Sequence, residues 1–158
     1  MKCEVAGAVL AAFVLAAATA CNRPAPKAAV PAAAELSAGV VEPYLRVGTA
    51  LASDSVEGVQ ADAQQIRSAA QALGPGATTI EMAAGGLAAA GDLRDARTQF
   101  GVLSETIDAY MAKEHLSPPA GVRGAFCPMA VRPWLQKGET LRNPYYGSQM
   151  LTCGSFKP

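Results

Sequence analysis

Apolar residues recur every three or four positions through the first part of the chain after residue 35, which is the spacing of an amphipathic helix. The first such stretch carries Leu36, Val40, Tyr44, Val47 and Leu51 on one face. Pro43 falls inside this stretch. Because proline removes a helical hydrogen bond, we expect the helix either to begin near Pro43 or to kink there.

Two further stretches show the same apolar seam. Their seam residues, in chain order, are Val56, Val59, Ala63, Ile66, Ala70 and Leu73, then Leu93, Ala96, Phe100, Leu103, Ile107 and Tyr110. A capping-box-like sequence at 54–57 precedes the first, and Asp92 is a suitable N-cap for the second. A weaker helix is expected over 78–89, interrupted by glycines at 85 and 86. Matching seams with short connections predict an all-α fold, an up-and-down bundle of about four helices.

The last third of the chain has a different pattern. Five of the nine aromatic residues follow position 125, and prolines and glycines interrupt every apolar run. Such a segment is not one helix. We expect a loop-rich C-terminal cap on the bundle, in which a short β-hairpin can form.

The N-terminus has the pattern of a secretion signal. Lys2 precedes an apolar run over 5–17, and Ala18-Thr19-Ala20 is a small-residue cleavage site. The sequence 18–21 resembles the lipobox of bacterial lipoproteins, with Cys21 as the residue that receives the lipid. The alternative is ordinary secretion with a free Cys21. We therefore expect a signal peptide over 1–20, a Pro/Ala-rich tether over 21–34 and a folded domain over 35–158.

Export through this signal fixes the expected location. A lipidated Cys21 would hold the protein on the periplasmic side of the outer membrane, because Asn22 gives no retention signal for the inner membrane. Without the lipid the protein would be free in the periplasm. The lipid is then the chain's only expected contact with a membrane.

Charge and composition exclude several function classes. Thirteen basic residues balance thirteen acidic ones, so the net charge gives no basis for binding nucleic acid. No phosphate-binding glycine loop, Cys-x-x-Cys pair or nucleophile with an orienting base is found. We expect a protein that is not an enzyme.

Sulfur ligands form two groups in the C-terminal cap. Cys127 and Met129 make the first, and Met150 and Cys153 make the second. Cys3 lies in the leader and Cys21 carries the lipid, so Cys127 and Cys153 are the thiols left in the mature domain. In an oxidising compartment two such cysteines usually form a disulfide. This alternative gives a disulfide-stabilised interaction module that binds a partner protein and no metal.

A soft-metal site is the other interpretation of these residues. Thiolate and thioether ligands together favour Cu(I), and Ag(I) by its similar softness. Zinc prefers nitrogen and thiolate ligands, and the chain has one histidine. Met111 and His115 are additional candidate ligands, since their spacing of four places them on one helical face if the helix continues to His115.

Several motifs resemble a bacterial periplasmic domain family of unknown function, found alone, often as a lipoprotein, or attached to adaptor subunits of copper/silver-type heavy-metal efflux pumps. The motifs are Cys127-Pro128-Met129-Ala130, Trp134-Leu135, Arg142-Asn143-Pro144-Tyr145-Tyr146-Gly147 and Met150-Leu151-Thr152-Cys153-Gly154, with Tyr44-Leu45, Asp54, Arg97-Thr98-Gln99-Phe100 and Leu103-Ser104 in the helical part. The resemblance covers residues from about 36 to the C-terminus.

The resemblance implies a link to heavy-metal efflux or homeostasis, with efflux components as partners. Cys127, Met129, Met150 and Cys153 would bind Cu(I) or Ag(I). Two positions depart from the family. Gln99 stands where relatives often have a histidine, and the segment 131–133 is shorter than its counterpart. We therefore predict an exported, lipid-anchored Cu(I)/Ag(I)-binding protein.

Overall fold

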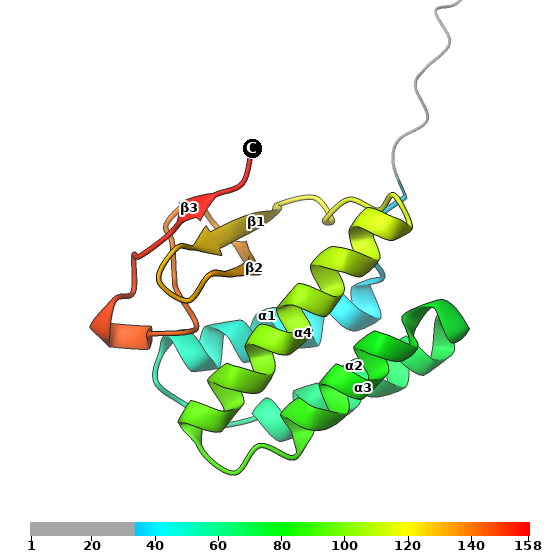
Figure 1. The fold of residues 1–158 in the computed structure, drawn as a ribbon, viewed down its shortest axis with the longest axis horizontal. Helices are drawn as coiled ribbons and strands as arrows, with labels where there is room; N and C mark the ends of the chain where they lie inside the picture. The colour runs from blue at the N-terminus through cyan, green and yellow to red at the C-terminus, as the bar shows by residue number, and fades with distance from the viewer. Residues whose placement is uncertain (1–33) are drawn as a thin grey trace, which may run out of the picture. The chain divides into compact units, whose positions relative to one another are not determined.

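The computed structural model describes residues 34–158, so the predicted signal peptide, Cys21 and all but the last residue of the tether lie outside the described residues. Four α-helices lead the fold: α1 (Ala38–Ala52), α2 (Val59–Ala72), α3 (Thr78–Ala88) and α4 (Leu93–Lys113). Three strands follow: β1 (Val122–Cys127), β2 (Arg132–Lys137) and β3 (Ser155–Phe156). Short 3₁₀ turns, η1 (Pro75–Ala77) and η2 (Gly147–Gln149), complete the elements. The predicted helical bundle with a hairpin cap is confirmed (Figure 1).

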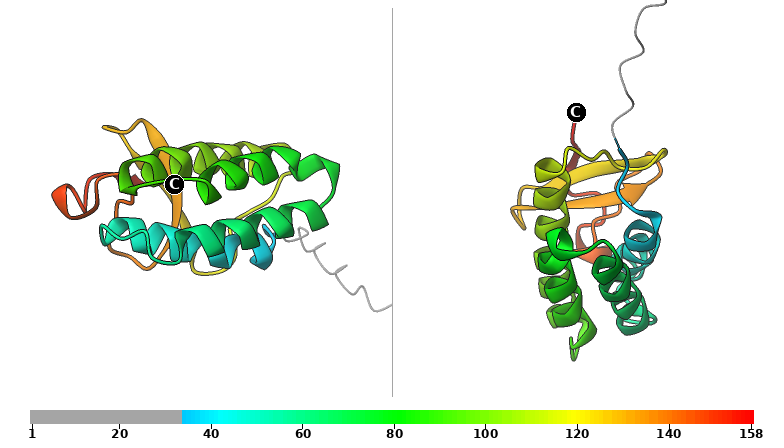
Figure 2. Two further views of the ribbon diagram at one scale, coloured as in Figure 1. Left: turned by 90° about the horizontal axis from the view of Figure 1, so that it is seen from below. Right: turned by 90° about the vertical axis from the view of Figure 1, so that its right-hand side faces the viewer.

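The helices pack in chain order, each against the next, as an up-and-down bundle requires. Strand β2 contacts both α1 and α4, and the sheet lies along the side of the bundle that these two helices form (Figure 2). The sheet is antiparallel with the order β2-β1-β3. The third strand adds a feature to the expected hairpin, and it fixes the C-terminal segment beside β1.

The helical seams form the core. Most of their residues are almost fully buried, among them Tyr44, Ile66, Phe100 and Leu103. At the end of the bundle where the described chain begins, Ala34 and Leu36 form main-chain hydrogen bonds with Ser117 in the connection between α4 and β1. None of the helices in residues 34–158 is both long and apolar enough to cross a membrane.

Several predicted helix ends are wrong. Helix α1 begins at Ala38 and contains Pro43, so the expected start near Pro43 is wrong, and α3 continues through its two glycines. The capping-box prediction at 54–57 also fails, because α2 begins at Val59 after Gly58, which has a φ of 75° and makes no side-chain cap. Val56, predicted as part of the seam, is 48% exposed. The N-cap at Asp92 is confirmed, since its side chain accepts a hydrogen bond from the Asp95 N–H.

Candidate functional site

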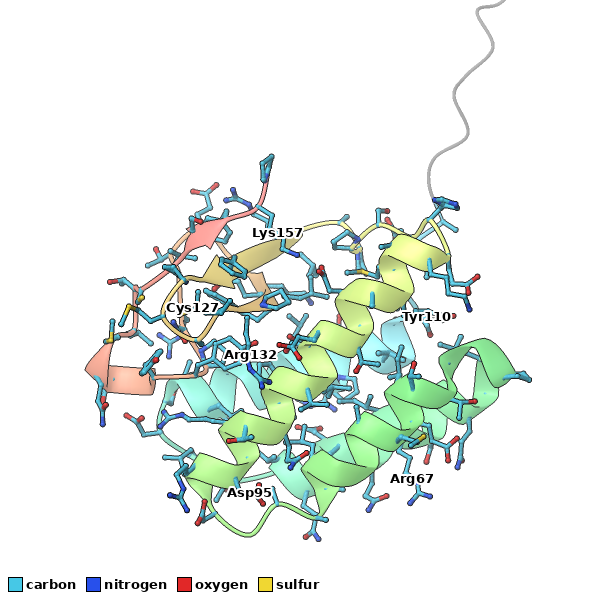
Figure 3. All side chains as sticks on the ribbon, viewed as in Figure 1. Arg67, Asp95, Tyr110, Cys127, Arg132 and Lys157 are labelled. Carbon is cyan, nitrogen blue, oxygen red and sulfur yellow. The ribbon has the colours of Figure 1, made fainter. Side chains whose placement is uncertain are left out.

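The structure places the two predicted cysteine ligands side by side. Cys127, labelled in Figure 3, ends β1. Cys153 lies two residues before β3, which pairs with β1. Their Sγ atoms are 3.9 Å apart, although the residues are 26 positions apart in the chain. Both thiols are free. We call Cys127 and Cys153 the sulfur pair.

Asn143 holds the loop that carries Cys153. Its side chain is fully buried, donates to the Cys153 carbonyl at 2.7 Å and accepts from the Tyr145 N–H at 2.8 Å. Its own N–H donates to the Leu151 carbonyl at 2.7 Å. Buried polar groups that are fully satisfied in this way make a loop rigid. Asn143 therefore fixes where Cys153 stands relative to β1.

Gly154 allows the chain to approach β1 closely. It has a φ of 140°, and a Cβ atom there would lie 2.8 Å from both the Phe126 carbonyl oxygen and the Trp134 ring. A side chain at this position would push the loop away from the sheet. The closeness of the two thiols thus depends on a glycine directly after Cys153.

Aromatic packing secures the other side of the cap. Trp134 meets Tyr145 edge to face, with ring centroids 6.1 Å apart, and its indole N–H donates to Gln136. The Tyr145 hydroxyl donates to the Pro133 carbonyl. These contacts pack the two aromatic rings against each other within the cap and satisfy both of their polar groups.

The environment of Cys153 disfavours a reactive thiolate, while Cys127 is sequestered in the cap. Cys127 is fully buried, and its Sγ accepts a hydrogen bond from the Ala130 N–H at 3.3 Å. Burial raises the pKa of the half-buried Cys153 thiol, and the neighbouring sulfur of Cys127 raises it further. A thiol with a raised pKa stays protonated at neutral pH and is a weak nucleophile. A bound soft cation would displace these protons.

The two predicted methionine ligands lie at the surface. Met129 is 61% exposed in the turn between β1 and β2, and Met150 is 37% exposed in the turn that leads to Cys153. The Cys153 N–H donates to the Met150 carbonyl at 3.0 Å, so this methionine is tied to the sulfur pair through the main chain. Both side chains are exposed and adjustable, unlike the two cysteines.

Met111 and His115 do not share a helical face as predicted, because α4 ends at Lys113. Met111 is buried in the core of the bundle. His115 has a φ of 55°, and the next N–H, of Leu116, donates to the Met111 carbonyl. This is the hydrogen bond of a Schellman motif, with His115 where glycine is usual. Strand β1 separates this helix end from Cys127, so neither residue belongs to the site.

Sequence reasoning missed the connection between the cap and the bundle. Asp54, in the turn after α1, pairs with Arg97 of α4 at 2.5 Å and accepts from the Ser148 N–H at 3.1 Å. Arg97 also donates to the Leu51 and Pro144 carbonyls. The sequence signal for this contact was Asp54 itself, which we had assigned to the cap of a helix at 54–57. Its partners are too distant in the chain to be found by local patterns.

Within residues 34–158, no group of three or more His, Cys, Asp or Glu side chains could hold a metal. Comparison of the chain with models of known protein families, with curated proteins and with solved structures found no match.

Proposed function

We propose that this chain is an exported, lipid-anchored protein that binds Cu(I) or Ag(I) and serves heavy-metal efflux or homeostasis. The observation that supports this most is the 3.9 Å separation of two free thiols held on rigid segments. Thiolates select soft cations. The predicted signal peptide and Cys21 supply the location, and the family resemblance supplies the link to efflux components.

The spacing of the sulfur pair favours a particular coordination. With the zinc–thiolate bond length of about 2.3 Å as a guide, a cation bound to both sulfurs would make an S–metal–S angle of about 116° across 3.9 Å. A linear two-ligand site would need about 4.6 Å between the sulfurs. The observed spacing therefore leaves room for a third ligand. Met129 and Met150, which follow and precede the two cysteines in exposed turns, are the candidates.

The second candidate function is a disulfide-stabilised interaction module, which the same sulfur distance favours. A disulfide has an S–S length near 2.05 Å, so the two sulfurs would have to approach by about 1.9 Å. In that state no thiolate remains for a metal, and the module would act by binding a partner protein.

One experiment separates the two functions. The chain from Asn22 onward would be purified without reductant, its free thiols counted, and Cu(I) titrated in competition with a chelator before and after reduction. We expect one tightly bound Cu(I) per reduced chain and loss of binding in Cys127→Ser/Cys153→Ser. Absence of free thiols in the exported protein, with no tight binding after reduction, would exclude the metal function.

Methionine variants test the third ligand. Met129→Leu and Met150→Leu keep a side chain of similar size but remove the thioether, and we expect at least one of them to weaken Cu(I) binding. Met82→Leu is the matched control, because Met82 is 71% exposed on α3, outside the cap. X-ray absorption should show three sulfur ligands. Two collinear sulfurs instead would contradict the geometry given above.

A further inference from the structure

Three arginines converge on one hollow beside the hairpin turn. The hollow has a volume of about 450 Å³ and is lined by Arg94 and Arg97 of α4, Arg132 of β2, and the adjacent Tyr145 and Tyr146. Its size lies within the range of small-molecule sites. Figure 3 shows Arg132 between the hairpin and α4.

The arginines are not equally neutralised. Arg97 pairs with Asp54, and Arg132 lies 3.6 Å from Glu105. Within residues 34–158, Arg94 has no carboxylate within ion-pair distance, and its side chain is exposed. The hollow therefore presents a guanidinium group that can accept an anionic partner.

The position of Arg94 has a cost for the fold. It stands in the first turn of α4, where the helix dipole disfavours a positive charge. Arg97 is one turn further along the same helix, and like charges at this spacing repel. Local rules are broken in this way mostly at functional sites. Elsewhere in the cap, Lys137 and Lys157 pair with Glu42 and Asp108, so the positive charge at the hollow is that of its own arginines.

We propose that this hollow binds an organic anion whose carboxylate or phosphate group lies among the three arginines and whose apolar part lies on the tyrosines and Leu93. Planar guanidinium groups bind such oxyanions with paired hydrogen bonds. Ala130 also lines the hollow, and its N–H donates to Cys127 Sγ. The anion would thus bind directly beside the turn that follows Cys127. The inference does not depend on metal binding.

The test is a titration followed by amide NMR on reduced, metal-free protein, with phenyl phosphate, phenylacetate and inorganic phosphate as probes. We expect saturable shifts at 93–98, 130–132 and 145–146, and tighter binding of the phenyl compounds than of inorganic phosphate. The stronger of the two phenyl compounds identifies the preferred head group. No saturable shift with any probe up to tens of millimolar would overturn the proposal.

Two charge-matched variants complete the test. Arg94→Gln should weaken binding about tenfold or more, because it removes a charged hydrogen-bond donor. Arg67→Gln removes the same charge from an exposed site on α2 and should leave binding unchanged. Equal weakening in both variants would mean a non-specific charge effect and would overturn the proposal. Binding should persist in Cys127→Ser/Cys153→Ser, which separates this result from the metal experiment.

Discussion

Tyr44→Phe tests how the cap is attached to the bundle. The Tyr44 side chain of α1 is almost fully buried, and its hydroxyl lies 2.6 Å from Ser104 Oγ of α4. The same hydroxyl accepts a hydrogen bond from the Leu135 N–H at 3.2 Å. Leu135 is on the edge strand β2, so no neighbouring strand can replace this acceptor. Phenylalanine keeps the ring, which stacks on Phe100 with centroids 4.8 Å apart, and removes the oxygen.

The expected loss of stability comes from the Leu135 N–H, which loses its acceptor when the Tyr44 hydroxyl is removed. Ser104 still donates to the Phe100 carbonyl at 2.8 Å, whereas the buried Leu135 N–H has no other acceptor described. A buried donor left unsatisfied costs about 1–3 kcal/mol. We therefore expect Tyr44→Phe to lower the free energy of unfolding by about 2 kcal/mol.

Urea unfolding measures this loss, with the buried Trp134 as the fluorescent reporter. The midpoint should fall while the m-value stays unchanged. Tyr110→Phe is the control, because Tyr110 is a partly buried tyrosine of α4 whose hydroxyl has no hydrogen bond in the described part of the chain. If Tyr44→Phe costs no more than Tyr110→Phe, the hydroxyl does not join the cap to the bundle and the reasoning is refuted.

Three other predictions concern the cap. Ser148 and Arg97 lower the pKa of Asp54 from 3.8 to about 2. The stability that the ionised Asp54 contributes is therefore present above about pH 4 and is lost as the pH falls towards 2. Between these pH values, the free energy of unfolding of Asp54→Asn should depend less on pH than that of the wild-type protein, as measured by acid unfolding. Val131 is exposed with a φ of 55°; Val131→Gly should raise stability in thermal unfolding by about 0.5–1 kcal/mol, and a decrease would contradict backbone strain there. Oxidation of the sulfur pair closes a loop across 26 positions and should stabilise the fold by about 3.5 kcal/mol in urea; a less stable oxidised form would show that the loop resists closure.

The parts of the fold that could be predicted are those set by local periodicity. Ala63 and Ile66 in α2, and Phe100 and Leu103 in α4, are buried where their spacing placed them. Their environment repeats with the helix, so a short window of sequence contains the information. Strand β3 has two residues, which is too short for any period to show.

For the candidate site, the sequence indicated which two cysteines belong together but not how close they lie. The association of Cys127 with Cys153 was predicted from the expected loss of Cys3 and lipidation of Cys21, whereas the distance between the two sulfurs depends on Asn143 and Gly154. The role of Asp54 could not be predicted, because Arg97 and Ser148 lie 43 and 94 positions away. Electrostatic and main-chain contacts across such separations leave no local pattern.

Both ends of helix α1 are attached to the C-terminal part of the chain. Just before its first turn, Ala34 and Leu36 are joined to Ser117, and just after its last turn Asp54 is joined to the segment that leads to Cys153. Its fifteen residues span about 22 Å. Helix α1 is therefore a spacer that keeps the start of the described chain and the segment leading to Cys153 about one helix length apart.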